Sequence, residues 1–430
     1  MSAVSSLPFF MRRPWRVWAG LCVLLVAAPW LWTSQFSHSL LTQMGIAILA
    51  CLSYNVLLGQ GGMLSFGHAV YTGLGAYLTI HALQAVSAGQ WPIPVSLLPL
   101  VGAVSGMGFA VLLGWISTRK AGTPFAMITL GVGELVAALA LMFPGFFGGE
   151  AGVSGNRVVG PPFLGVSFGP QIQVYYLVAA YTLVGVGALY AFTQTPLGRL
   201  LNAVRDNPER VEFLGFNPQR VRHLAFIMAG CFAGLAGGLA ALHFEIVTAE
   251  VVGSARSGAY LLFTVVGGAG FFAGPILGGV LMVLATVWLS ALTPAWLLYL
   301  GLIFVFMVMY APGGLASLVV ALLRRLRSGP VGPMATACLG LVVTAGVMLV
   351  GAGALVEMAY HRQLQSALGD PVRYLGLTLD TGGLDSWVGA LLVMLTGLGL
   401  FELVRRQCLC AGDVGGHGSG HEPARQEGHP

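Results

Sequence analysis

The sequence predicts an all-α fold, a polytopic α-helical membrane protein with about ten core transmembrane or re-entrant segments and two extra C-terminal helices. Three observations support this class. Hydrophobic residues make up 57% of the chain, charged residues only 8%, and the mean hydropathy is +0.84. A water-soluble domain would have roughly a quarter of its residues charged. The apolar residues also form runs of helix length, with basic residues gathered at the ends of the runs.

The first predicted helix covers 17–33 and follows Arg12, Arg13 and Arg16. A basic segment before an apolar run is typical of a signal peptide, but this run lacks a small-x-small cleavage site and further apolar runs follow at once. We therefore predict an uncleaved helix after a cytoplasmic N-terminal segment, 1–16. The other core spans are predicted at 40–58, 66–86, 92–117, 125–143, 172–193, 223–243, 258–272, 275–291 and 296–321.

Two of these spans, 258–272 and 275–291, are shorter than the roughly 20 residues that a straight crossing needs, and we expect a re-entrant pair there. The span 223–243 carries Gly230, Gly234 and Gly238, one glycine every fourth residue. Small residues at this spacing lie on one helix face and let two helix backbones approach closely. We interpret them as a packing face.

The basic residues agree with a topology that alternates from a cytoplasmic N-terminus, because every basic cluster then lies on the cytoplasmic side. Besides the N-terminal arginines these clusters comprise Arg119 and Lys120, the arginines of 195–223, then Arg324, Arg325 and Arg327, and finally Arg405 and Arg406. The net charge of +5 and the pI near 9.0 therefore reflect membrane orientation. We predict no nucleic-acid partner.

Beyond the core, 326–404 is expected to form an extra transmembrane pair, with spans at 333–355 and 387–404, followed by a disordered cytoplasmic tail, 405–430. The tail holds Cys408, Cys410, His417, His421 and His429. Their spacing fits no tight zinc pattern, so no metal site is predicted.

Two glycine-rich breaks interrupt the apolar spans, at 59–68 and at 267–275. Irregular backbone at membrane depth is expected where it lines a cavity between structural repeats. The first break also holds the polar residues Gln60, Ser65 and His68, which we assign to the substrate pathway. The alternative is a simple turn between two helices.

Glu134 is the acidic residue in the middle of the strongly apolar run 125–143. A charged carboxylate there costs about 2.5–3.5 kcal/mol on insertion scales, so it must face protein or water. We add Glu134 to the substrate pathway, the alternative being a hydrogen-bond partner between two helices.

The loop 144–171 is long and glycine-rich and is predicted on the outer side of the membrane. A loop of this length without a core of its own serves either as a docking surface or as a flexible cover. Composition does not separate the two.

The polar segment 195–222 lies between two long apolar spans and concentrates arginines in a chain with 20 basic residues. It contains three helix starts, each an N-cap residue followed by the proline that suits the first helical position. They are Thr195-Pro196, Asn207-Pro208 and Asn217-Pro218. The segment is therefore predicted to be folded.

An amphipathic helix is predicted from Pro196, followed by a shorter one from Pro208. In the first helix the apolar stripe comprises Leu197, Leu200, Leu201 and Val204, and the polar face Arg199, Asn202, Arg205 and Asp206. In the second, Glu209 lies at the positive N-terminus, Val211 and Leu214 share a face, and Gly215 is the left-handed cap. Such a pair suits contact with a soluble partner; a solvated loop that only fixes orientation is the alternative.

Motifs for catalysis are absent from the sequence. It has no G-x-x-x-x-G-K-[ST] phosphate loop, no H-E-x-x-H and no G-x-S-x-G, and Lys120 is its single lysine. We therefore predict no enzyme, no catalytic residue, and no cofactor or metal in this chain. A gradient-driven transporter would need more buried ionisable groups than Glu134. If energy is used, we expect it to come from a partner.

Five segments carry a family resemblance: LLGQGGMLSFGHAVYTGLGAY at 57–77, TPFAMITLGVGELV at 123–136, GGEAGVSG at 148–155, TPLGRLLNAVRDNPERVEFLGFN at 195–217 and GGAGFFAGPILGG at 267–279. Together they resemble the branched-chain amino acid ABC transporter permeases, and more narrowly the high-affinity leucine/isoleucine/valine M-type subunits. The resemblance covers about 15–325, with 17–325 as the permease domain. It implies a bacterial inner-membrane importer with a second related permease, cytoplasmic subunits that bind ATP and Mg, and a periplasmic substrate-binding protein.

The resemblance also assigns residues. Ala203, Arg205, Asp206, Asn207 and Gly215 match the family's ATPase-coupling loop. With Arg199 and Glu209 from the same helices, they form our candidate coupling site.

Three alternatives remain open. Urea and short amides use similar permeases; a lone gradient-driven transporter or channel could use Glu134; and the extra C-terminal helices could serve a non-transporting scaffold.

Overall fold

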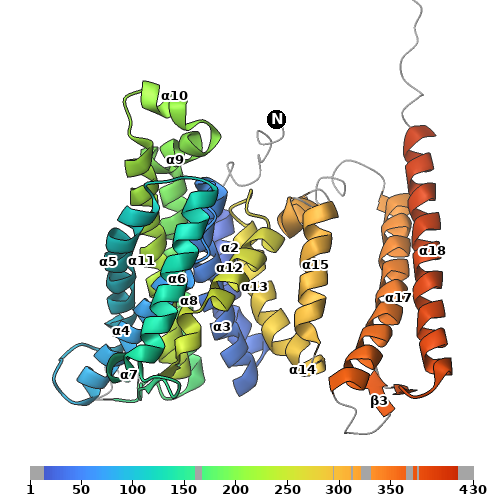
Figure 1. The fold of residues 1–430 in the computed structure, drawn as a ribbon, viewed down its shortest axis with the longest axis horizontal. Coiled ribbons are helices and arrows are strands. Elements are labelled where there is room, and N and C mark those ends of the chain that lie inside the picture. The colour runs from blue at the N-terminus through green and yellow to red at the C-terminus, as the bar shows by residue number, and fades with distance from the viewer. Residues whose placement is uncertain are drawn as a thin grey trace, which may run out of the picture. The chain divides into compact units, whose positions relative to one another are not determined.

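The computed structural model describes residues 14–159, 167–293, 295–310, 313–320, 331–364, 371–374 and 377–414 (Figure 1). Residues 1–13 of the predicted N-terminal segment 1–16 lie outside these residues. So do the cluster Arg324, Arg325 and Arg327 and residues 415–430 of the predicted tail 405–430, which hold its three histidines. Helices dominate the described chain, as predicted for an all-α membrane protein.

Each predicted apolar span coincides with a helix. The N-terminal helices are α2 (Pro14–Leu31), α3 (Gln35–Asn55), α4 (Ala69–Ser87), α5 (Leu98–Ser117), α6 (Thr123–Met142) and α8 (Gln171–Gln194). The later ones are α11 (Pro218–Phe244), α12 (Ser254–Gly267), α13 (Gly274–Val283), α15 (Trp296–Tyr310), α17 (Val331–Leu364) and α18 (Leu384–Val414). Within the described residues six helices are long and apolar enough to cross a membrane, and a seventh span results if Trp296–Met309 and Gly314–Val320, bent by 58°, count as one.

Short elements connect the long helices. They are the π-turns η1 (Val56–Gln60) and η4 (Leu284–Leu289), the 3-10 turns η2 (Val95–Leu97) and η3 (Ala249–Val252), and the helices α7 (Pro144–Phe147), α9 (Pro196–Asp206), α10 (Pro208–Phe213) and α14 (Ser290–Leu292). Strand β1 (Val153–Ser154) pairs antiparallel with β2 (Ile246–Val247), and β3 (Pro371–Tyr374) with β4 (Leu377–Asp380).

The chain divides into two compact units. The first comprises Met1–Leu289 and Leu300–Val320, and the second Ser290–Tyr299 and Ala321–Pro430. In the first, α11 lies beside α5 (Figure 1), in contact through glycines. A Cβ atom at Gly234 would lie 2.2 Å from the carbonyl oxygen of Gly102, and one at Gly230 would lie 2.4 Å from the Cβ of Ala110. The predicted packing face of α11 is therefore confirmed: its backbone meets α5 with no room for a larger side chain.

In the second unit, α17 and α18 form an antiparallel pair joined by the β3–β4 hairpin. A Cβ atom at Gly351 would lie 2.4 Å from the backbone nitrogen of Met394, and one at Gly397 would lie 2.4 Å from that of Met348. Helix α18 continues to Val414, so the prediction of disorder from 405 is wrong for 405–414. The apolar pattern ends near 404, and the helix runs on through polar residues that the pattern does not mark.

Candidate functional site

The segment 195–222 folds as two short helices, α9 and α10, ahead of the long helix α11. Each predicted N-cap side chain is in place. Thr195 Oγ1 accepts the Gly198 N–H at 3.2 Å, Asn207 Oδ1 that of Arg210 at 3.0 Å, and Asn217 Oδ1 those of Gln219 and Arg220 at 2.9 and 3.3 Å. These bonds satisfy N–H groups that have no partner inside the helix. The three predicted helix starts are confirmed.

Gly215 closes α10 with a backbone φ of +85°, in the left-handed region. Its N–H donates to the Glu212 carbonyl at 2.9 Å, and the Phe216 N–H donates to that of Val211 at 3.2 Å. These two bonds make a Schellman motif, which satisfies the last carbonyls of the helix and reverses the chain. The predicted glycine cap is therefore confirmed.

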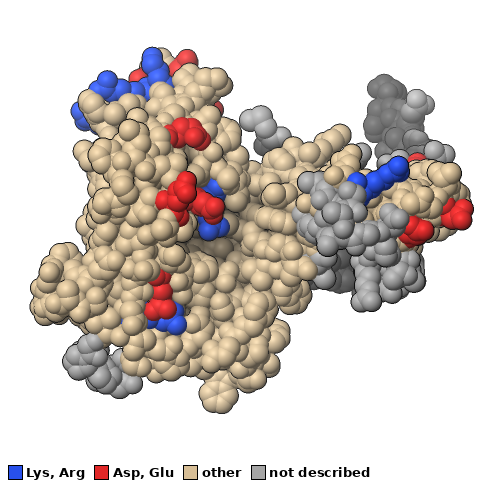
Figure 2. Space-filling view, turned by 60° about the horizontal axis from the view of Figure 1, so that its bottom comes forward, with Lys and Arg blue, Asp and Glu red and all other residues tan. Residues whose placement is uncertain are grey.

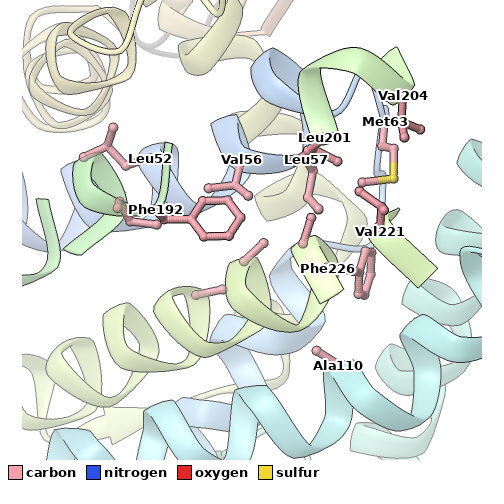
Figure 3. Close-up of a cluster of buried hydrophobic side chains, with 14 of the residues drawn as sticks. Leu52, Val56, Leu57, Met63, Ala110, Phe192, Leu201, Val204, Val221 and Phe226 are labelled. Atoms are coloured by element: carbon pink, nitrogen blue, oxygen red, sulfur yellow. The ribbon is translucent and has the colours of Figure 1, made fainter. Parts of the chain in front are cut away.

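The apolar stripe of the two helices packs into a buried cluster of the membrane bundle. Leu201, Val204 and Val211 are at most 1% exposed, and they belong to the same cluster as Leu57 and Met63 (Figure 3). The stripe therefore holds α9 against η1, and α10 packs on α9 and α11.

The far side of α10 presents apolar side chains to the surroundings. Phe213 is 91% exposed, Leu214 68% and Phe216 47%. We expected Leu214 to share the buried face of Val211, and this was wrong because Leu214 is the C-cap residue, where the chain leaves the helix. Phe213 was not among the residues singled out from the sequence. Its position two residues after the buried Val211, about 200° around the helix, was the available signal.

The candidate coupling residues all lie on the exposed side of this helix pair. They are Arg199, Ala203, Arg205, Asp206, Asn207, Glu209 and Gly215. Figure 2 shows basic and acidic side chains gathered at the upper end of this unit, with separate charged groups further down the same face. Apolar side chains surrounded by charged ones are typical of a protein–protein interface, which has an apolar centre and a polar rim.

Two polar side chains of α9 contact the first glycine break. Asn202 Nδ2 donates to Gln60 Oε1 at 2.9 Å, and the Arg205 guanidinium donates to the Gly59 carbonyl oxygen. The same guanidinium contacts Asp206 Oδ1 at 3.1 Å. Gln60, which we assigned to the substrate pathway, is thus bound to the helix pair.

The rest of the first break is buried inside the bundle. Ser65 and His68 are both 0% exposed. His68 Nε2 lies 2.9 Å from Ser53 Oγ, and the Tyr54 hydroxyl donates to the Ser65 carbonyl at 2.9 Å. Within the described residues, Ser65 Oγ and His68 Nδ1 have no hydrogen-bond partner.

Glu134 is separate from these groups. It lies on the exposed surface of α6, while its neighbour Gly133 packs 3.5 Å from the Gly67 Cα, measured from an ideal Cβ. The four predicted pathway residues are therefore not gathered at one place: Gln60 meets α9, Ser65 and His68 are enclosed, and Glu134 faces outward. Their role in a pathway stays a prediction.

The two glycine breaks meet at Gly59. A Cβ atom there would lie 2.2 Å from the Ala269 carbonyl oxygen and 2.3 Å from Asn55 Oδ1. Only a glycine allows η1 to approach the turn between α12 and α13 this closely.

The described part of the loop 144–171 is fixed to the end of α11. Arg157 donates to the carbonyl oxygens of Phe168 at 2.8 Å and His243 at 3.0 Å, and to Gln171 Oε1 at 3.1 Å. Strand β1 pairs with β2 immediately after α11. These contacts hold the described part of the loop in place.

Comparison with known proteins shows which permeases the chain is similar to. Residues 37–313 match the model of a family described as the permease component of branched-chain amino acid transport systems. The LivM high-affinity branched-chain amino acid permease of Salmonella typhimurium is 31% identical over 318 residues, which cover 69% of this chain and 73% of that protein. The LivM protein of Escherichia coli is 30% identical with the same coverage.

A more distant relative carries another substrate in its name. The fructose import permease FrcC of Rhizobium meliloti is 28% identical over 165 residues, 37% of this chain and 45% of that protein. No solved structure matches the chain. The family match ends at 313, before the α17–α18 pair begins.

Proposed function

The chain belongs to the family of branched-chain amino acid transport permeases, and from this premise we propose that it is the membrane-spanning subunit of an ATP-driven importer. Its substrates would be branched-chain, aliphatic amino acids, the solutes named for its LivM relatives. The subunit would work in the bacterial inner membrane with its N-terminus in the cytoplasm.

The protruding helix pair α9–α10 is the observation that carries the proposal. One side is anchored in the bundle by side chains at most 1% exposed, and the other presents Phe213, 91% exposed, within a charged rim. A rigid element transmits motion only if both of its faces are held. The membrane bundle holds the anchored face, and a cytoplasmic ATP-binding subunit would hold the exposed one.

Glu134 supports a second permease as a further partner. It is exposed near the middle of α6, and only 33% of the apolar stretch of this helix is buried. A charged carboxylate facing lipid would cost about 2.5–3.5 kcal/mol. A second permease subunit covering this face, or water in a pathway between the two subunits, would remove that cost.

The outer loop supports a periplasmic binding protein. Arg157 and the β1–β2 pairing fix the shape of this surface before any partner arrives. Docking onto a pre-shaped surface avoids the entropy of ordering a loop. The binding protein would then determine much of the substrate selectivity. This agrees with the similarity between this chain and permeases that are named for different solutes.

Purification and reconstitution test the proposal. The tagged chain is isolated in mild detergent, the proteins that accompany it are identified, and the complex is placed in vesicles with the binding protein. We expect uptake of labelled leucine that requires ATP on the ATPase side and stops when the ATPase active site is disabled. Urea and acetamide are measured in parallel. Flux without ATP that collapses in Glu134→Gln would instead favour a gradient-driven transporter.

Topology gives an independent check. Single cysteines at Asn202 and Glu212 are expected to resist membrane-impermeant thiol reagents added to intact cells, and to react in inverted vesicles. Labelling from the outside would place the helix pair on the wrong side of the membrane for an ATPase.

A further inference from the structure

Helix α3 ends in the π-turn η1, and side chains from α9 donate hydrogen bonds to groups at this end. The last carbonyls of a helix have no partner within it. Here the Leu57 carbonyl accepts the Met63 N–H at 2.9 Å, and the Leu58 carbonyl accepts the Gly62 N–H at 3.0 Å. The next carbonyl, that of Gly59, accepts the Arg205 guanidinium, and Asn202 binds the Gln60 side chain. Helix α9 therefore caps η1.

The contact is close because two glycines leave room for the α9 side chains. A Cβ at Gly62 would lie 2.7 Å from the Arg205 Cγ, and one at Gly61 would lie 3.2 Å from the Leu201 Cδ1. Gly62 also has a φ of +63°. The Arg205 stem thus rests directly on backbone, and a shift of α9 cannot be absorbed by an intervening side chain.

On its other side, η1 touches the second glycine break. The ideal Cβ of Gly59 lies 2.2 Å from the Ala269 carbonyl oxygen. The residues after η1 continue the series, since the Phe66 N–H donates to Thr129 Oγ1 of α6 at 3.1 Å and the Ala69 N–H donates to Ser257 Oγ of α12 at 2.9 Å. One short irregular segment therefore connects α9 with α6, α12 and the turn before α13.

We propose that Arg205 and Asn202 are positioning residues that link α9 to η1, so that displacement of the α9–α10 pair moves the glycine break at 59–68 and, through Gly59, the turn at 268–274. A π-turn suits this role because it is a short, irregular piece of helix that often marks functional sites. The inference rests on the proposed importer, in which an ATPase moves α9–α10, and it goes further by naming the residues that carry the movement into the membrane.

Hydrogen exchange of the purified complex tests the linkage without measuring transport. In the wild type, trapping the ATPase with ATP and vanadate is expected to change the amide exchange of 195–216 and of 56–68. In Arg205→Ala the change at 195–216 should remain and the change at 56–68 should be lost. Persistence of the nucleotide effect at 56–68 in Arg205→Ala, or its absence in the wild type, would overturn the linkage.

Transport per ATP hydrolysed is the second measurement. Losing the charge-assisted hydrogen bond in Arg205→Ala is expected to lower labelled leucine uptake more than it lowers the ATPase rate, so that uptake per ATP hydrolysed falls about tenfold. Lys120→Ala, which removes an exposed cation from the loop between α5 and α6, is the matched control and should leave both unchanged. Equal loss of uptake and hydrolysis in Arg205→Ala would indicate a merely structural role and overturn the proposal.

Conservative and paired variants keep the test decisive if Arg205→Ala fails to assemble. Arg205→Lys keeps one donor and should restore part of the coupling. Asn202→Ala and Gln60→Ala should each lower uptake per ATP, and the double variant should be no worse than either single one, since the two residues share one bond. Additive effects would overturn the Asn202–Gln60 contact as part of the linkage. A wild-type complex that shows the exchange changes but takes up no leucine would count against the proposed substrate alone.

Discussion

Arg157 and Glu245 bind each other twice, through an ion pair of 3.9 Å between Nη1 and Oε2 and a hydrogen bond of 2.8 Å from the Arg157 backbone N–H to Oε1. Glu245 sits directly after α11 with a φ of +57°, a conformation that is uncommon outside glycine. The pair thus joins the loop 144–171 to the helix that forms the centre of the bundle.

Replacing Arg157 with alanine should loosen the loop 144–171. Its side chain is only 11% exposed, and its loss leaves several carbonyl oxygens without their donor. We expect a destabilisation of about 2 kcal/mol, the scale of a hydrogen bond to a charged group. Thermal unfolding of the purified protein, followed by circular dichroism, measures it. Glu150→Gln, an exposed change in the same loop, is the control, and equal melting of the two variants would contradict the assignment.

Gly215→Pro should abolish uptake while the protein remains inserted in the membrane. Proline fixes φ near −65° and has no N–H, whereas residue 215 has a φ of +85° and donates to the Glu212 carbonyl. Gly215→Asn is the matched variant, because asparagine tolerates the left-handed region and no atom lies within 4 Å of the added Cβ. Uptake and membrane insertion are measured together. Normal uptake in the proline variant would show that this cap has no part in coupling.

A charge at the tip of α10 should weaken ATPase binding without unfolding the permease. Phe213 is 91% exposed, so Phe213→Asp costs little in the isolated chain, but it would place a charge in an apolar contact. We expect less ATPase to copurify and the melting temperature to stay the same. Val211→Asp, at a side chain 1% exposed, should instead lower the melting temperature. Full ATPase recovery with Phe213→Asp would place the docking contact elsewhere.

Gly59→Ala should be far more damaging than Gly131→Ala. At Gly59 the new methyl group would lie 2.2 Å from the Ala269 carbonyl oxygen, whereas at Gly131 it meets nothing within 4 Å. Forced overpacking of this kind costs about 1–3 kcal/mol. Detergent-solubilised yield and thermal unfolding of the two variants provide the comparison. Similar stability would mean that η1 and the second break can separate freely.

The helices and their caps could be predicted from sequence because they depend on local signals. Thr195, Asn207 and Asn217 each precede a proline, and the apolar spans are recognised by their length. The apolar stripe of α9 was equally readable, since Leu201 and Val204 follow the helical period.

The contacts of the site could not be predicted in the same way, because they join residues far apart in the chain. Nothing near Arg205 in the sequence indicates that its guanidinium caps a carbonyl at residue 59. Arg157 likewise appears in the sequence as a lone basic residue in a glycine-rich loop, and two of the carbonyl oxygens to which it donates belong to the distant helix α11. Leu214 was misplaced because a cap residue no longer follows the period of its helix.

The bare aromatic tip of α10 has a consequence for how cells assemble the complex. A subunit made in excess over its partners would expose Phe213 and Leu214 to the cytosol, where chaperones and proteases recognise exposed hydrophobic surface. We expect such orphan copies to be degraded, so the abundance of the permease would follow that of the subunit that shields it.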